Sequence, residues 1–86
     1  MTLYFTQSFR KKAAKFTKNN SQLSSRLKKQ FALFQNNPYH LGLRLHKLKG
    51  KRSEQYAVWI EGNFRALAIK EGDVYTFFDL VTHDQY

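Results

Sequence analysis

Cysteine is absent from the 86 residues of this chain, and proline occurs once. Without cysteine the protein has neither a disulfide framework nor a thiolate metal site, which is typical of a reducing compartment. No apolar run approaches the length of a membrane span, and no basic segment precedes a signal-length apolar run at the N-terminus. The sequence therefore predicts a soluble protein that is not exported, does not enter a membrane and resides in the cytoplasm.

Acidic residues are missing from the first part of the chain. Residues 1–53 contain no Asp or Glu, yet they hold all but two of the 15 Lys and Arg residues, and the formal net charge is +9. All six acids lie in residues 54–86. This asymmetry favours a polyanionic partner for the N-terminal half, either a nucleic acid or an acidic protein. A basic surface that contacts only solvent is the alternative interpretation.

Local patterns predict a strand and two helices in the N-terminal half. Residues 2–6 are short, aromatic and β-prone. A basic amphipathic helix is expected from Thr6 or Ser8, both suitable N-cap residues, to Asn19. A second helix is expected from Ser21 until the single proline ends it. The two helices form an antiparallel hairpin whose apolar stripes need a shared surface.

The sequence of the C-terminal half predicts a β-sheet, which can supply the surface that the two helices share. Residues 41–45 alternate leucine with other residues and suggest an extended segment or loop. Residues 55–60, 64–69 and 74–81 are strand-like runs separated by Glu-Gly-Asn and Glu-Gly-Asp turns, which predicts an antiparallel meander. With the strand at residues 2–6, this gives an α+β fold of order β-α-α-β-β-β. We expect a small antiparallel sheet of about four strands with the helical hairpin packed on it.

Three sequence pieces carry a resemblance to a known family. Residues 46–51 read His-Lys-Leu-Lys-Gly-Lys, residues 63–65 read Asn-Phe-Arg, and residues 82–84 read Thr-His-Asp. In this order, and over essentially the whole chain, the sequence resembles the RelE/ParE superfamily of bacterial toxins. The resemblance implies one toxin domain over residues 1–86 and a cognate antitoxin that wraps and neutralises it. It also implies one of two activities, because the RelE-like branch cleaves messenger RNA, often in the ribosomal A site, whereas the ParE-like branch acts on DNA gyrase.

Metal-independent RNA cleavage requires a base for the 2′-hydroxyl, a cation for the charge on the phosphate, and an acid for the leaving 5′-oxygen. His83 titrates near neutrality, and the resemblance puts a catalytic residue there, so we predict it as base or acid. Asp84 either orients His83, acts as a second base, or is a surface acid. Arg65 has planar, permanently charged donors for phosphate oxygens, and the resemblance places the transition-state arginine here. A structural salt bridge from Arg65 to Glu54 or Asp79 is the alternative.

The basic stretch from Arg44 to Arg52 adjoins this predicted site. Lysines at alternate positions of an extended segment point to one side, so they are expected to form a row along an RNA backbone. His46 has the opposite parity and is predicted as an auxiliary base or acid. Trp59 is expected in the core. The terminal tyrosine can stack on a base, although a frayed end is as plausible. The predicted RNA-binding residues are Arg44, Lys47, Lys49, Lys51 and Tyr86.

No metal or cofactor is predicted. The three histidines lack zinc-like spacing, the acids are scattered, and no Gly-rich phosphate loop is present. The leading hypothesis is therefore an endoribonuclease toxin that cleaves ribosome-bound mRNA and is bound by an acidic antitoxin. The basic helices would face ribosomal RNA or that antitoxin. A ParE-like toxin that binds gyrase without nuclease activity, or an inactive basic RNA-binding domain, are the alternatives.

Overall fold

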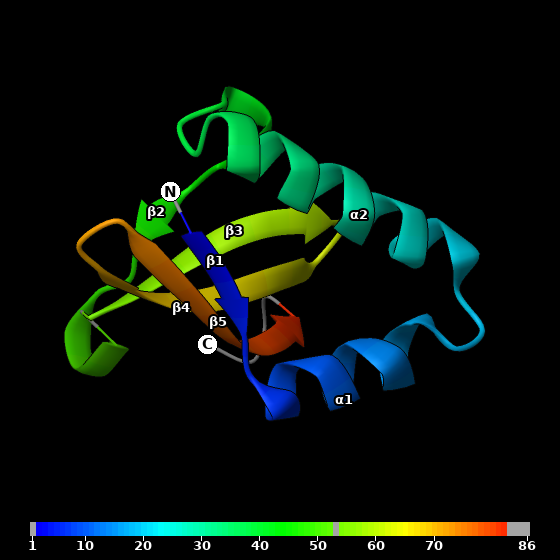
Figure 1. The fold of residues 1–86 in the computed structure, drawn as a ribbon. Helices are drawn as coiled ribbons and strands as arrows, with labels where there is room; N and C mark the ends of the chain where they lie inside the picture. Colours follow the sequence, from blue (N-terminus) through cyan, green and yellow to red (C-terminus); the bar gives the residue numbers. More distant parts are fainter. Residues whose placement is uncertain (1, 53, 83–86) are drawn as a thin grey trace.

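The computed structural model describes residues 2–52 and 54–82. They form an α+β structure with a five-stranded sheet of order β1-β5-β4-β3-β2, shown in Figure 1. The two helices and the predicted strands are all present, so the predicted fold class is confirmed. The elements are β1 (Thr2–Phe5), α1 (Gln7–Thr17), α2 (Ser21–Asn36), the 3-10 turn η1 (Leu41–Leu43), β2 (His46–Lys47), the 3-10 turn η2 (Gly50–Arg52), β3 (Gln55–Glu61), β4 (Phe64–Glu71) and β5 (Val74–Thr82).

Two details of the sheet differ from the prediction. The sheet is mixed, because β1 pairs with β5 in parallel while the other neighbouring strands are antiparallel. Local sequence patterns identify strands but not their partners, so the parallel pair was not predictable from them. The fifth strand is β2, which pairs with β3 over two residues only. A strand of that length is too short to show a period-two pattern.

Both helices begin at side-chain caps, and the cap of α1 is one of the two that the sequence suggests. Thr6 Oγ1 accepts a hydrogen bond from the Phe9 backbone N–H at 3.1 Å, so Thr6 rather than Ser8 is the N-cap of α1. Asn20 Oδ1 accepts from Leu23 N at 3.0 Å and caps α2. Each cap satisfies one backbone donor that the helix itself leaves without a partner. Asn37, before the single proline, ends α2 in an extended conformation.

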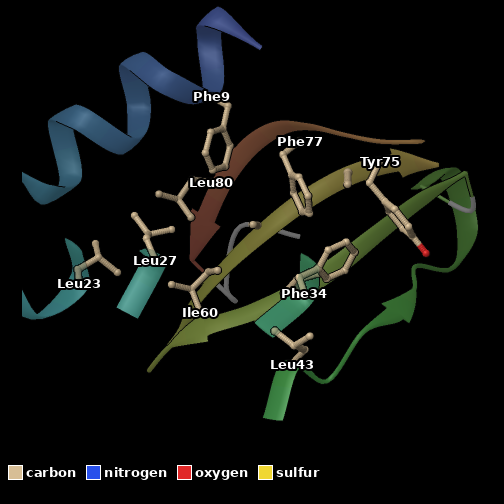
Figure 2. Packing of buried hydrophobic residues seen from close by; sticks show 12 residues of the cluster. Phe9, Leu23, Leu27, Phe34, Leu43, Ile60, Tyr75, Phe77 and Leu80 are labelled. Atoms are coloured by element: carbon tan, nitrogen blue, oxygen red, sulfur yellow. The ribbon is translucent and has the colours of Figure 1, made fainter. Parts of the chain in front are cut away.

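The helices cover one face of the sheet. Phe9 of α1 and Leu23, Leu27 and Phe34 of α2 pack against alternate residues of β3, β4 and β5. Figure 2 shows these side chains converging, with Phe34 edge-on to Tyr75 at 4.8 Å between ring centroids. The sheet residues of this core are Val58, Ile60, Ala66, Ala68, Tyr75, Phe77 and Leu80. Burial raises the pKa of the Tyr75 hydroxyl, which keeps it uncharged within the core.

The other face of the sheet has a much smaller apolar cluster. Leu48, Ala57, Leu67 and Val81 are buried there, and Phe78 packs against them half-buried. Phe78 falls where the register between β4 and β5 shifts between Leu67 and Ala68, which is a β-bulge. Among the described residues neither helix contributes to this cluster, so we call this side of the sheet the open face. Neither helix in the described part of the chain is long and apolar enough to span a membrane.

Candidate functional site

Strand register brings Arg65 and His46 to the open face. Arg65 on β4 lies opposite Trp59 of β3 and Val81 of β5. His46 on β2 lies opposite Ala57 of β3. Residues directly opposite one another in an antiparallel pair share a face, and Ala57 and Val81 belong to the open-face cluster. Two of the predicted site residues, far apart in the sequence, therefore lie on the open face.

The guanidinium of Arg65 is held against the turn between β3 and β4. Its Nη1 donates to the Gly62 carbonyl at 3.0 Å and to the Phe64 carbonyl at 3.1 Å. Arginine has five N–H donors. Among the described residues, the hydrogen bonds of Arg65 come from Nη1, so Nε and Nη2 are available to a ligand. Asp79, one of the two acids considered as a partner of Arg65, instead accepts from Lys12 Nζ at 2.7 Å. Arg65 is thus a half-buried, oriented cation on a mostly apolar face.

His46 is exposed, and its orientation fixes its tautomer. Its Nδ1 lies 2.9 Å from the Arg44 carbonyl oxygen, which can only accept a hydrogen bond. Nδ1 must therefore carry the proton, and in the neutral ring the lone pair resides on Nε2. Nε2 is the atom that would take a proton from a substrate hydroxyl. His40 has the opposite arrangement: its Nδ1 accepts a hydrogen bond from the Gly42 N–H at 3.0 Å and so carries no proton.

The expected row of lysines is not regular. Lys47 lies opposite Tyr56, whose ring contacts Tyr75 on the helix-covered side, so Lys47 has the opposite parity from His46, as the sequence predicts. Lys51 lies in η2, after Gly50 with its φ of +69°, and so outside any extended run. The prediction of a straight row is wrong because the chain turns at Gly50. Lys47, Lys49 and Lys51 are all exposed, and their role as RNA ligands stays a prediction.

Trp59 has a different environment from the one expected. It is half-buried, and neither apolar cluster of the described residues includes it. The guanidinium carbon of Arg44 lies 4.6 Å from the Trp59 ring centroid, and that of Arg26 on α2 lies 5.2 Å from it. The indole Nε1 donates to the Gly62 carbonyl at 2.9 Å, the same oxygen that Arg65 contacts. Trp59 therefore links two further arginines to the Arg65 site.

Gln30 holds this corner of the molecule together. It is a buried polar residue of α2, and its Nε2 donates to the Gly42 carbonyl at 3.1 Å and to the Trp59 carbonyl at 2.8 Å. These bonds tie α2 to both η1 and β3. Sequence reasoning missed Gln30, although its spacing from Leu23, Leu27 and Phe34 places it on the buried stripe of α2. A glutamine at such a position indicates a buried hydrogen-bonding role.

The C-terminal part of the predicted site lies outside the described residues. This applies to His83, Asp84 and Tyr86. The last described rungs of β5 pair Val81 with Arg65 and Thr82 with Phe64. β5 therefore brings the chain alongside Arg65 immediately before His83 in the sequence. In the described residues no group of three or more His, Asp or Glu side chains is arranged to hold a metal ion.

Comparisons with known proteins agree on the fold. No protein-family model matches the sequence, and a search of curated proteins gives no match. Among solved structures, a YoeB/ParE toxin from Agrobacterium tumefaciens superposes with a TM-score of 0.77 at 14% identity, over 96% of this chain and 99% of that chain. YafQ from E. coli strain BL21(DE3) gives a TM-score of 0.76 at 16% identity, over 96% and 93% of the two chains.

A third match comes from a complex. The E. coli DinJ–YafQ toxin-antitoxin complex gives a TM-score of 0.74 at 16% identity, over 96% of this chain and 92% of the matched chain. The chain therefore has the fold of the YoeB/ParE and YafQ toxins over nearly its full length. The resemblance to the RelE/ParE superfamily is confirmed at the level of the fold. One fold hosts several activities, so the activity must be argued from the residues of the site.

Proposed function

We propose that this protein is the toxin of a toxin–antitoxin pair and acts as a metal-independent endoribonuclease in the cytoplasm, cleaving ribosome-bound mRNA and so inhibiting translation. The observation that carries the proposal is the placement of Arg65 and His46 on the open face. A permanent cation and an exposed imidazole with a free lone pair on the same sheet face suit phosphodiester chemistry. A module that only binds a protein does not require a titrating group there.

The reaction uses the nucleophile that RNA supplies. A base removes the proton of a 2′-hydroxyl, the 2′-oxygen attacks the adjacent phosphorus, and the bond from phosphorus to the 5′-oxygen breaks. An acid protonates that 5′-oxygen, which leaves a 2′,3′-cyclic phosphate on one product and a 5′-hydroxyl on the other. His46 and His83 are the two titrating groups proposed for these proton transfers, and either can be the base. Arg65 stabilises the charge that accumulates on the non-bridging oxygens.

The remaining predicted residues act around this centre. Asp84 is proposed to orient His83, and Tyr86 to stack on a base. Lys47, Lys49, Lys51 and Arg44 are proposed to bind phosphates of the RNA. Each such contact releases a counterion, so binding must weaken as salt concentration rises.

The test compares RNA cleavage by the wild type, His83→Ala and Arg65→Ala. Loss of one general acid or base should lower the rate by about 100- to 10,000-fold, and loss of the oriented cation by about 100- to 1,000-fold. Lys70→Ala, an exposed cation at the far end of β4, is the control and should cleave at the wild-type rate. Mapping of new mRNA 5′ ends and of the cyclic phosphate identifies the reaction.

The same experiment separates the alternatives. Cleavage that is unchanged in His83→Ala and Arg65→Ala would show that the proposed residues are not the site. Growth arrest with DNA damage and no RNA cleavage would support a ParE-like toxin that binds gyrase. RNA binding with neither cleavage nor arrest would indicate an inactive RNA-binding domain.

The partner proposed is an acidic antitoxin that binds between the two helices. An apolar groove of about 360 Å³ lies there, lined by Phe9, Ala13, Ala14, Leu27 and Phe31 among others, with Lys28 at its border. Neither helix contains an acid, and together they carry seven Lys and Arg residues. An amphipathic helix with an apolar stripe and acidic flanks complements such a groove. The complex of the similarly folded YafQ with DinJ supports a partner of this kind.

This surface is testable with a matched pair of variants. The chain is co-expressed with each small acidic protein encoded by a neighbouring reading frame, and binding is measured on the purified pair. Ala14→Glu places a charge in the groove and should weaken binding at least about tenfold, because the carboxylate loses hydration and faces acidic side chains. Ala32→Glu, at an exposed position of α2, should have no effect. Equal affinity of both variants would exclude the groove as the docking site.

A further inference from the structure

Trp59 lies between two arginines, Arg26 and Arg44, of which the proposed function uses only Arg44. The guanidinium carbons of Arg44 and Arg26 lie 4.6 Å and 5.2 Å from its ring centroid, within the range of a cation–π contact. Arg65 adjoins these residues, because its Nη1 and the indole Nε1 donate to the same Gly62 carbonyl. We call Trp59, Arg26 and Arg44 the tryptophan cluster. It joins α2, η1 and β3 at the end of the open face.

The backbone at Arg44 is held in a conformation that side chains rarely adopt. Arg44 has φ +49° and ψ +39°, the left-handed region, and is the only residue other than glycine with a positive φ in the described part of the chain. Its N–H donates to the Leu41 carbonyl at 3.2 Å, and Gln30 holds the neighbouring Gly42 carbonyl. Strained residues of this kind gather at ligand sites, where the surrounding structure maintains them. Here the strain places the Arg44 side chain over Trp59.

Within residues 2–52 and 54–82, the cluster has positive charge without a matching carboxylate. None of the acids in the described residues forms an ion pair with Arg26, Arg44 or Arg65. Guanidinium groups that converge on one ring repel one another, and the electron-rich ring face offsets this repulsion only in part. An anion that binds several of them at once removes the remaining repulsion. The chemistry of the cluster thus favours a ligand with both negative charge and a flat face that stacks.

A nucleotide has both features. Unpaired bases stack on aromatic rings and on guanidinium planes, and phosphates bind the edges of the same guanidinium groups. We propose that the tryptophan cluster is a subsite for the nucleotide that flanks the cleaved phosphodiester, with its phosphate on Arg26 and Arg44 and its base stacked on the cluster. The inference rests on the proposed function and extends it, because it adds Trp59 and Arg26 to the RNA-binding residues.

The location of the cluster favours RNA over an acidic peptide. It is continuous with Arg65 through the Gly62 carbonyl and with His46 through the Arg44 carbonyl, which accepts from His46 Nδ1 at 2.9 Å. A strand of RNA with its reacting phosphate at Arg65 must place a neighbouring nucleotide within a short distance of Arg65. The Arg44 carbonyl therefore places the subsite next to His46.

The chain contains a single tryptophan, so its fluorescence reports on the subsite alone. The protein is titrated with a short oligoribonucleotide that is 2′-O-methylated throughout and therefore not cleavable. We expect quenching of Trp59 fluorescence, and about tenfold weaker binding by an Arg26→Ala, Arg44→Ala double variant. An abasic oligomer of the same length, which has phosphates without bases, should bind more weakly and quench less. Arg26→Lys with Arg44→Lys retains charge but loses the planar stacking group, so it should recover only part of the affinity.

Kinetics on a cleavable RNA provide the second readout. The double alanine variant should raise KM about tenfold and leave kcat within about threefold, because the cluster binds the substrate without contacting the reacting atoms. Lys70→Ala, which removes one exposed cation away from the cluster, should change neither the KM nor the fluorescence titration. Circular dichroism and thermal unfolding of each variant verify that the fold is retained.

The outcomes distinguish a failure of the subsite proposal from a failure of the nuclease proposal. If the wild type cleaves RNA but the oligonucleotide leaves Trp59 fluorescence unchanged, the subsite is wrong and the nuclease proposal stands. If no RNA is cleaved but quenching occurs and depends on Arg26 and Arg44, the cluster is an RNA-binding site and the nuclease proposal is wrong. Quenching by poly-glutamate with no response to the oligonucleotide would make the cluster a protein-binding surface and overturn the inference.

Discussion

The two faces of the sheet differ in what their side chains do. The helix-covered face contains most of the core, including Phe34, Phe77 and Leu80, which have no solvent exposure. The open face has a thin apolar cluster around Leu67, and beside it lie charged and aromatic groups that hold hydrogen bonds to backbone carbonyls. Stability and the proposed chemistry are thus assigned to opposite sides of the same strands. Substitutions on the two faces should therefore separate loss of folding from loss of function.

The largest stability effect is expected at the centre of the covered face. Phe77 packs against the rings of Phe5, Phe9, Phe31 and Phe34, with centroid separations from 4.9 to 6.3 Å. Phe77→Ala should lower the free energy of unfolding by about 3–5 kcal/mol, a large part of the stability of a domain of this size. Urea denaturation measures the change. Phe78→Ala, on the open face and half-buried, is the control and should cost clearly less; equal losses would contradict the contrast between the faces.

The next largest loss of stability is expected for Gln30, which ties α2 to η1 and β3. Gln30→Met removes the donor to the Trp59 and Gly42 carbonyls. Leaving buried acceptors without this donor should cost about 1–3 kcal/mol. Because Trp59 and Arg44 lose a common anchor, the intrinsic fluorescence of Trp59 should also change. Gln22→Met, at an exposed position of α2, should alter neither quantity, and an unaffected spectrum in Gln30→Met would show that Gln30 does not hold the cluster.

A smaller change is expected at the start of α1, next to the covered face. Thr6→Ala removes the oxygen that accepts from the Phe9 N–H. Loss of an N-cap threonine costs about 1 kcal/mol. Thr6→Ser keeps the hydroxyl and should recover most of the loss in thermal or urea unfolding. A serine variant as destabilised as the alanine variant would mean that the methyl group, rather than the cap, is important.

The smallest effect is expected for the Lys12–Asp79 ion pair. Both side chains are about one-third exposed, at 34% and 32%. A double-mutant cycle should give a coupling energy of about 0.2–1 kcal/mol that decreases as salt is added. Coupling that is larger and insensitive to salt would indicate that the pair is a structural anchor between α1 and β5 rather than a surface contact.

The covered face was largely predictable from the sequence, and the open face was not. Phe9 and the Leu23, Leu27, Phe34 stripe have helical spacing, so periodicity alone identifies both helices and their buried sides. The turns at Gly62 and Gly72, both with positive φ, similarly mark the ends of β3 and β4. These features depend on neighbours in the sequence, which is why local patterns reveal them.

The arrangement of the site depends on register between distant segments. The sequence suggested Arg65 and His46 as site residues, but only the pairing of β2 with β3 and of β3 with β4 shows that they share a face. The same pairing gives Lys47 the opposite parity from His46, as expected, whereas the turn at Gly50 breaks the expected row before Lys51. The contacts of Arg26, Arg44 and Trp59 bring together three separate elements, and no local pattern contains them. Long-range geometry of this kind requires the folded structure.

The most direct measurement compares activity and stability in a single open-face variant, Arg65→Gln. RNA cleavage rate and urea unfolding are measured on the same preparation, with Lys70→Gln on the same strand as the control. The account predicts a rate at least about 100-fold lower and a free energy of unfolding within about 0.5 kcal/mol of the wild type, as for other substitutions away from the core. Cleavage at the wild-type rate, or a loss of activity that only follows a loss of stability, would contradict the assignment of the chemistry to the open face.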